Sequence, residues 1–206
     1  MLRAANTIAA ISTAGGVGGI GKVRLSGPEA LAIAKTICSG QIVPREAGFH
    51  NFYNADQEIV DQGVILFFPN PKSFTGEDVI EFQGHGGQTV LNAVLNLCID
   101  KGARLAEPGE FTRRSYLNNK MDLAQAESVI DVINATTIEA VKSAAQSLSG
   151  KFSIKINGLL KKLIELRVFV EACLDFPEEE IDFIEQGNVI DRLNNIAAEV
   201  DQILLV

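Results

Sequence analysis

The chain has 206 residues, of which 47% are hydrophobic and 21% charged, a composition typical of a globular protein with one large or two small domains. It contains no run of roughly 18 apolar residues, so we expect no membrane span, and its short apolar stretch near the start predicts no signal peptide. The net charge of −8 argues against a broad nucleic-acid-binding face, although a local basic site remains open.

Up to about residue 120, short strand-like runs alternate with two helical patterns. The strand-like runs are residues 7–12, 22–26, 48–54, 63–68, 77–83 and 103–106. The first helix is expected to have Pro28 as its first residue and to end before Gly40, and the second to run from Gln88 to Asp100, where Gly102 ends it. Because strands and helices do not alternate strictly, this pattern predicts an α+β domain with a mixed sheet.

The sequence after this point contains only helical patterns. One helix is expected to begin after Asp122, its N-cap residue, and another to restart at Thr136 or Thr137. The apolar pattern of the second continues to about Leu174, where Pro177 ends it. A helix of this length is typical of a bundle or an elongated helical arm.

Two glycines within the long pattern, Gly150 and Gly158, are candidate weak points. A last helix from about Asn188 ends without a stop signal, so we expect the chain to be part of a longer protein. Together these patterns predict an α+β domain up to about residue 120, followed by an all-α region.

The cysteines and histidines predict no metal site. The three cysteines, Cys38, Cys98 and Cys173, are far apart, odd in number and not in a C-x-x-C spacing. We expect buried free thiols, as in a reducing cytoplasm. With two histidines in the chain, the sequence offers no plausible zinc ligand set.

Two glycine-rich motifs could surround a ligand. GVGGIG (16–21) matches the dinucleotide fingerprint G-x-G-x-x-G, but that site requires a helix after the last glycine. A strand-like run follows here, so we expect a flexible loop that joins two strands. GHGG (84–87) precedes a helix, and its His85 could be catalytic, structural or a turn residue.

Charged residues within the strand-like runs each have two interpretations. Alternation places Arg24 on the other face of the strand from Val23 and Leu25. There it is either a solvated side chain or a clamp for an anion. Glu81 is by default a solvent-facing residue, but a covered Glu81 would need a partner with adjacent N–H groups, such as the edge of a pterin.

Near the boundary between the two regions, Arg113, Arg114 and Lys120 form a basic cluster. This cluster is either a solvated run of charges or part of a ligand cleft between domains.

Three segments closely resemble the N-terminal part of the MnmE (TrmE) family, the tRNA modification GTPases of bacteria and organelles. They are SFTGEDVIEFQGHGG (73–87), RLAEPGEFTRRSYLNNKMDLAQAE (104–127) and VEACLDFPEEEIDF (170–183). The resemblance implies that residues 1–118 are similar to tetrahydrofolate-binding domains and form a homodimer. It also implies that the helical region is interrupted by an inserted G domain, just after the last residue of this chain. The sequence has no G-x-x-x-x-G-K-[ST] loop, so we expect no GTP hydrolysis by this segment.

The resemblance also implies a cofactor site and partners. The family's folate-contacting positions match Arg24, Glu81 and Lys120, which implies a site for 5-formyl- or 5,10-methylene-tetrahydrofolate. GTP, Mg²⁺ and K⁺ would bind the absent G domain, and the flavoprotein MnmG (GidA) would be the partner in modifying position 5 of the wobble uridine of certain tRNAs in the cytoplasm. One departure is STAGGVGG (12–19), where the family usually has TPPG followed by two glycines.

Two other functions fit the same residues. The first is a dimerisation scaffold with a non-functional folate pocket, which the altered glycine loop favours and the retained Arg24, Glu81 and Lys120 disfavour. The second is a folate enzyme in its own right, such as an aminomethyl transferase, which the absence of an evident catalytic acid disfavours.

Overall fold

The computed structural model describes residues 6–175 and 188–204, and the chain divides into two compact units, Met1–Ala126 and Glu127–Val206. The first unit contains a mixed sheet with helices and the second is helical, which confirms the predicted fold class. In the described ranges, no helix is both long enough and apolar enough to cross a membrane.

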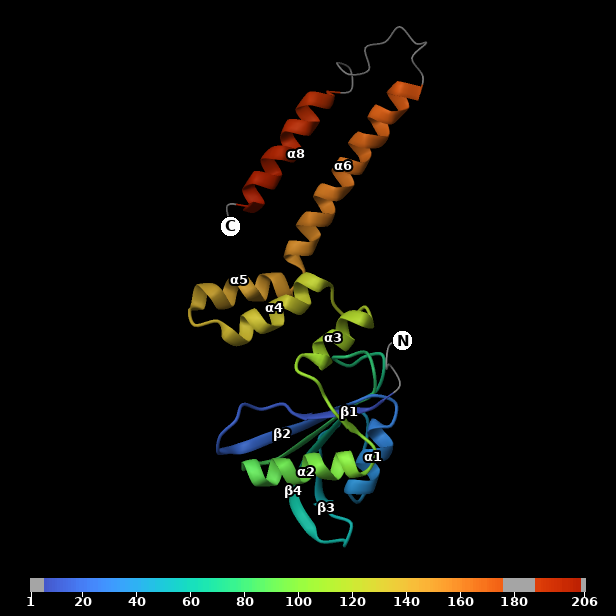
Figure 1. The fold of residues 1–206 in the computed structure, drawn as a ribbon, viewed down its shortest axis with the longest axis vertical. Helices are drawn as coiled ribbons and strands as arrows, with labels where there is room; N and C mark the ends of the chain where they lie inside the picture. The colour runs from blue at the N-terminus through green and yellow to red at the C-terminus, as the bar shows by residue number, and fades with distance from the viewer. Residues whose placement is uncertain (1–5, 176–187, 205–206) are drawn as a thin grey trace. The chain divides into compact units, whose positions relative to one another are not determined.

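The first unit is built on a six-stranded sheet (Figure 1). Its strands lie in the order β3-β4-β5-β2-β1-β6. The strands are β1 (Ile8–Ile11), β2 (Gly18–Ser26), β3 (Gly48–Tyr53), β4 (Ile59–Phe68), β5 (Val79–Gly86) and β6 (Arg104–Leu105). All neighbouring strands are antiparallel except β1 and β6, which are parallel. The six predicted strands are therefore present, with shifted ends.

One face of the sheet packs against α1 (Ala30–Ile37) and α2 (Gln88–Asp100). Directly paired residues such as Val23 and Phe82 project to this face and are buried in the core. The alternate residues of the same strands project to the opposite face, which α1 and α2 leave open. Arg24 and Glu81 belong to this second set, which we call the open face.

The prediction that Pro28 is the first residue of a helix is wrong. Helix α1 begins at Ala30, with Glu29 as its N-cap residue. The backbone N–H of Glu29 donates to the hydroxyl of Thr7, 2.9 Å away, so the helix is capped by a residue distant in sequence. Such a partner leaves no signal in the local sequence.

The polar segments at the end of the first unit form a short helix and the start of the predicted next one. Helix α3 spans Glu110–Leu117, and α4 spans Leu123–Asn134. As predicted, Asp122 caps α4: its carboxylate accepts from the backbone N–H of Gln125, and the side chain of Gln125 accepts from the N–H of Asp122.

In the second unit, the long predicted helix is broken in two. Helix α5 (Ile138–Leu148) is capped by Thr137, and α6 spans Lys151–Asp175. The break lies at Gly150, whose φ of +82° is left-handed, whereas Gly158 stays helical. The segment around Pro177 lies outside the described residues.

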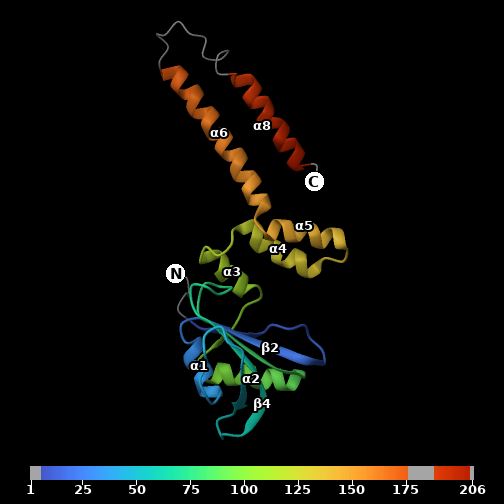
Figure 2. The same cartoon turned by 180° about the vertical axis from the view of Figure 1, so that it is seen from behind.

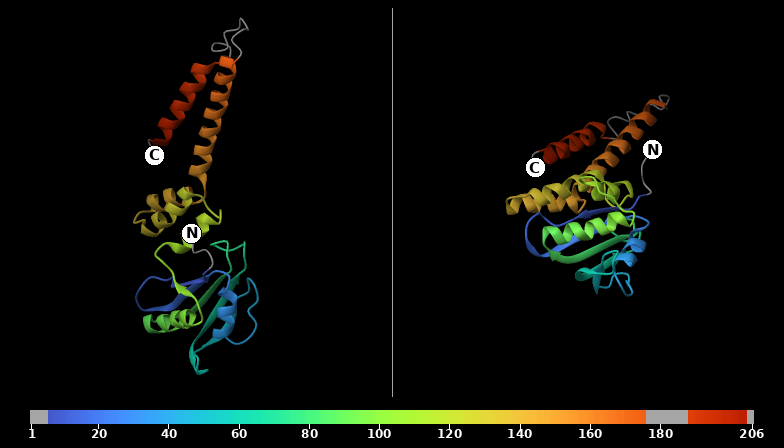
Figure 3. Two further views of the ribbon diagram at one scale, coloured as in Figure 1. Left: turned by 45° about the vertical axis from the view of Figure 1, so that its right-hand side comes forward. Right: turned by 60° about the horizontal axis from the view of Figure 1, so that its bottom comes forward.

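Helix α8 (Val189–Leu204) lies beside α6, as Figures 2 and 3 show from different sides. The two helices pack through a small apolar core of Leu159, Leu166 and Ile196.

Candidate functional site

A buried carboxylate lies in the middle of the open face. Glu81 on β5 is 6% exposed, and its direct neighbour across the β2–β5 pairing is Arg24. Arg24 donates to Oε1 of Glu81 from Nη2 at 2.7 Å and from Nε at 3.0 Å. Lys22, two residues earlier on β2, places its ammonium 2.8 Å from Oε2. The default expectation of a solvent-facing Glu81 is therefore wrong, because two cations of the neighbouring strand cover it.

The two cations keep this carboxylate charged. Burial acts to raise the pKa of Glu81, but hydrogen bonds from Lys22 and Arg24 outweigh it, and the pKa lies below its usual value. Glu81 is thus a fixed negative charge, which suits a ligand that presents N–H donors.

Arg24 is held between two aromatic rings as well as by Glu81. Its guanidinium carbon lies 5.5 Å from the ring centre of Phe74 and 5.7 Å from that of Phe111. Phe74 belongs to the loop 69–78 between β4 and β5, and Phe111 to α3. Both distances fit cation–π contacts, so the position of Arg24 depends on two elements outside the sheet.

Lys120, the third predicted ligand residue, follows α3 and packs against the same loop 69–78. Its ammonium donates to the carbonyl of Pro71 at 3.0 Å, and its stem lies 3.2 Å from where a side chain at Gly76 would begin. The loop that supplies Phe74 to Arg24 is thus the loop that Lys120 contacts. The structure brings Arg24 and Glu81 into direct contact and links Lys120 to them through this loop.

The predicted basic cluster does not form as one group. Arg114 is 6% exposed and donates to Glu77 at 2.9 Å, to Glu110 at 3.1 Å and to the carbonyl of Asn6 at 2.9 Å. Arg113 is exposed on the other side of α3, where it pairs with a carboxylate at the surface. The interpretation of three solvated charges is therefore wrong for Arg114, which is a buried structural residue.

The buried network around Arg114 predicts an acid-sensitive first unit. Burial acts to raise the pKa of Glu110, but hydrogen bonds from Arg104, the Glu107 N–H and Arg114 outweigh it and lower the pKa to about 2. A carboxyl with a lowered pKa contributes stability that is fully present above its unfolded pKa and is lost as the pH falls toward the folded value.

We therefore expect the urea midpoint of the first unit to fall between pH 6 and pH 3, and to fall less in Glu110→Gln. Tyrosine fluorescence measures this unit alone, since both tyrosines of the chain, Tyr53 and Tyr116, lie in it. Glu107→Gln, which alters an exposed carboxylate of the same region, is the control and should keep the full pH dependence.

The GHGG motif holds a histidine–carboxylate pair. Nδ1 of His85 lies 2.6 Å from Oδ1 of Asp61, and the backbone N–H of His85 donates to Oδ2 at 2.9 Å. Asp61 on β4 is buried, and its Oδ2 lies 2.2 Å from where a Cβ at residue 84 would be, which explains a glycine there. His85 also lines a groove of about 380 Å³ on the open face, together with Ile20, Phe49 and Gln83.

The GVGGIG motif is not a dinucleotide site. Gly18 to Gly21 belong to β2, which continues to Ser26, so no helix begins directly after the last glycine. A side chain at Gly21 would begin 2.6 Å from Leu91 of α2, so close packing explains this glycine. The loop between β1 and β2 covers residues 12–17 and is shorter than the predicted one.

Sequence reasoning missed Lys22 and Asp61. Lys22 alternates with Arg24 on β2, and this spacing could have placed both cations on one face. Asp61 reaches His85 through the pairing of β4 with β5, and this pairing leaves no local signal in the sequence.

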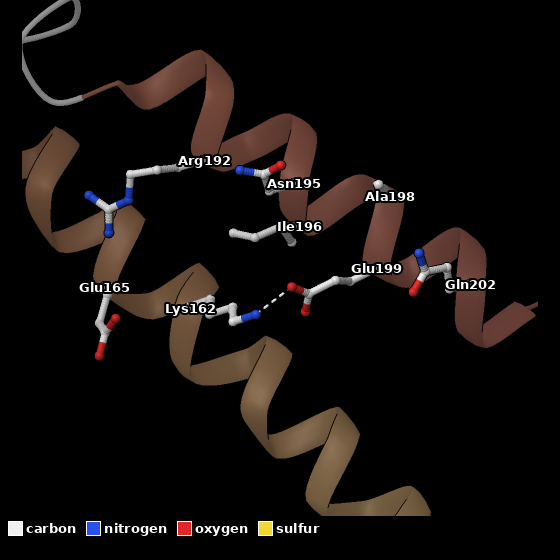
Figure 4. Close-up of a pocket in the computed structure, with 8 residues that line it drawn as sticks. All are labelled: Lys162, Glu165, Arg192, Asn195, Ile196, Ala198, Glu199 and Gln202. Atoms are coloured by element: carbon white, nitrogen blue, oxygen red, sulfur yellow. Dashed lines mark hydrogen bonds and ion pairs between the residues drawn. The ribbon is translucent and has the colours of Figure 1, made fainter.

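The second unit has a groove of about 450 Å³ between α6 and α8 (Figure 4). An ion pair between Lys162 and Glu199 crosses it, and Arg192 lies 5.8 Å from the ring centre of Phe169. These charged groups already pair across the helices, and we assign no ligand to this groove.

Comparisons with known proteins agree with this division into a sheet unit and a helical unit. The family model "GTP-binding protein TrmE N-terminus" matches residues 7–120, and the model "MnmE helical domain" matches residues 123–205. The chain is 50% identical to a protein of Stutzerimonas stutzeri over 204 residues, which are 99% of this chain and 45% of that protein.

It is 52% identical to a Saccharophagus degradans protein over 198 residues, 96% of this chain and 43% of the relative. It is 53% identical to one of Chromobacterium violaceum over 195 residues, 94% of this chain and 43% of the relative. All three relatives are named tRNA modification GTPase MnmE. The chain therefore spans less than half the length of each.

Proposed function

Since this chain belongs to the MnmE (TrmE) family, whose N-terminal and helical-domain models together match most of it, we propose that its first unit binds a tetrahydrofolate and forms a homodimer. The ligand would be 5-formyl- or 5,10-methylene-tetrahydrofolate, and the residues that hold it would be Arg24, Glu81 and Lys120. In this proposal, residues 1–118 are the folate-binding and dimerisation domain, and residues 119–206 are the first part of the helical domain.

One observation carries this proposal: Glu81 is a buried, charged carboxylate on the sheet face that α1 and α2 do not cover. A pterin presents a ring N–H and an amino group side by side, and these two donors fit a carboxylate. Arg24 would donate to a carbonyl oxygen of the ligand and Lys120 to a carboxylate. Phe74 and Phe111, which flank Arg24, supply apolar surface for a flat ring.

Calorimetric titration with 5-formyltetrahydrofolate tests the proposal. Saturable binding by the folded chain is the expected result, and no binding would contradict a competent folate pocket in these residues. The alternative, a dimerisation scaffold with a non-functional pocket, is favoured by one observation: both oxygens of Glu81 already accept hydrogen bonds within the chain.

The homodimer would form through the open face. This face carries exposed apolar side chains, with Ile20 74% and Phe49 68% exposed, beside the groove that His85 lines. Neighbouring apolar residues at the surface are typical of protein–protein contacts. A second copy would supply the cover that α1 and α2 give to the other face.

We expect Phe49→Lys to weaken this dimer by at least tenfold, because a charge would be buried at its centre. Sedimentation velocity over a range of concentrations measures the change. Leu105→Lys, which places a lysine at an exposed apolar position on the edge strand β6, is the matched control and should dimerise normally. Equal dimerisation of both variants would contradict an interface on the open face.

The whole protein would act on tRNA. The relatives' name, tRNA modification GTPase, supports a role in tRNA modification. In this proposal the folate would supply a one-carbon unit for position 5 of the wobble uridine. GTP, Mg²⁺ and K⁺ would bind a G domain that these 206 residues do not include, and the flavoprotein MnmG would carry the redox chemistry in the cytoplasm.

A further inference from the structure

The carboxylate of Glu81 has little capacity left for a ligand. Its Oε1 accepts from two nitrogens of Arg24, and its Oε2 accepts from Lys22 at 2.8 Å and from the amide of Gln83 at 3.3 Å. A carboxylate oxygen has two lone pairs in its plane. A ligand that binds Glu81 must therefore displace at least one of these donors.

The donors differ in how firmly they are held. Arg24 makes two hydrogen bonds to Glu81 and lies against the rings of Phe74 and Phe111, so moving it would disturb three elements. Lys22 makes one contact to Glu81 through a flexible four-carbon stem, and its side chain is 28% exposed. Solvent can therefore hydrate its ammonium once it leaves Glu81. Of the two cations, Lys22 is thus the one that leaves at the lower cost.

We propose that Lys22 occupies the ligand's place on Oε2 of Glu81 and competes with any pterin-like ligand. This inference rests on the proposed folate site and adds a residue that sets its affinity. Binding would exchange one donor for another: the ammonium moves into solvent, and an N–H of the ligand takes its position. The same exchange speeds release, since the ammonium can return to Oε2 as the ligand leaves.

Three variants of the 206-residue chain give a graded test with 5-formyltetrahydrofolate as the probe. Lys22→Met keeps the length of the stem and removes the competitor, so it should bind roughly 3- to 10-fold tighter than the unmodified chain. Lys22→Arg offers two N–H groups to Oε2 and should bind more weakly. Lys101→Met, at the end of α2, is the control and should change nothing.

Calorimetry gives the affinities, and stopped-flow measurement of ligand release should show slower dissociation from Lys22→Met. If Lys22 had only a structural role, both Lys22 variants would bind the probe more weakly than the unmodified chain, and Lys22→Met would not bind more tightly. Tight binding by Lys22→Met alone, with none by the unmodified chain, would support the competition but contradict folate binding by the unmodified chain.

Two results would overturn the inference in different ways. If the unmodified chain binds and Lys22→Met binds equally or more weakly, the competition is wrong and the folate site stands. If neither folded chain binds, the proposed folate site fails, and the competition fails with it. Circular dichroism of each variant shows that it is folded.

Discussion

Glu81→Gln should weaken the binding of 5-formyltetrahydrofolate by roughly 30- to 150-fold, which corresponds to about 2–3 kcal/mol. The substitution keeps the shape of the side chain and removes its charge. Two charge-assisted contacts to the ligand become neutral, and the new amide group points a donor at the ligand's donors. Calorimetric titration beside the unmodified chain measures the loss.

The loss of binding is separable from a loss of folding. Arg24 and Lys22 are 24% and 28% exposed, so water can solvate them when the charge of Glu81 is removed. We therefore expect only a modest fall in stability. Glu46→Gln, in an exposed loop of the same unit, is the control and should bind as the unmodified chain does. Unchanged affinity in Glu81→Gln would place the ligand elsewhere.

Arg114→Met should destabilise the first unit by about 3–5 kcal/mol, since it removes the buried cation that Glu77 and Glu110 share. Arg114 contacts Glu77, Glu110 and the backbone of Asn6, and thus ties α3 to the loop 69–78 and to the start of the sheet. Methionine fills a similar volume but offers no donor. Urea unfolding followed by tyrosine fluorescence measures the free energy of unfolding of this unit.

The neighbouring residue provides the matched control for this prediction. Arg113 lies on the same helix, but it is 58% exposed and pairs with Glu107 at the surface. Arg113→Met should change the free energy of unfolding by less than about 1 kcal/mol. Similar losses in the two variants would show that the network around Arg114 is not what stabilises the unit.

The strands of the first unit could be predicted from the sequence because each has its own alternation of apolar and polar residues. Their pairing could not, and the candidate site depends on it. Glu81 is buried because β2 lies beside β5 in a register that opposes Arg24 to it. Alternation gives the face of a residue, whereas the neighbouring strand decides whether that face is covered.

The helical region illustrates a second limit. Gly150 and Gly158 occupy similar places in the apolar pattern, yet only Gly150 breaks the helix. Glycine permits a left-handed residue without requiring one. Which glycine ends a helix depends on how the flanking segments pack, and that information is not local.

The pairing of β1 with β6 has a consequence for how the first unit forms during synthesis. These two strands come from opposite ends of the unit, with Ile8 paired to Arg104, and β1 also lies between β2 and β6. The antiparallel strands β2 to β5 can associate earlier, but β6 can join β1 only after about half of the chain has left the ribosome. Until then the outer edge of β1 has open hydrogen-bonding groups. The nascent chain would therefore be most prone to aggregation before residue 105 emerges, and a slow passage of the ribosome there would prolong that risk.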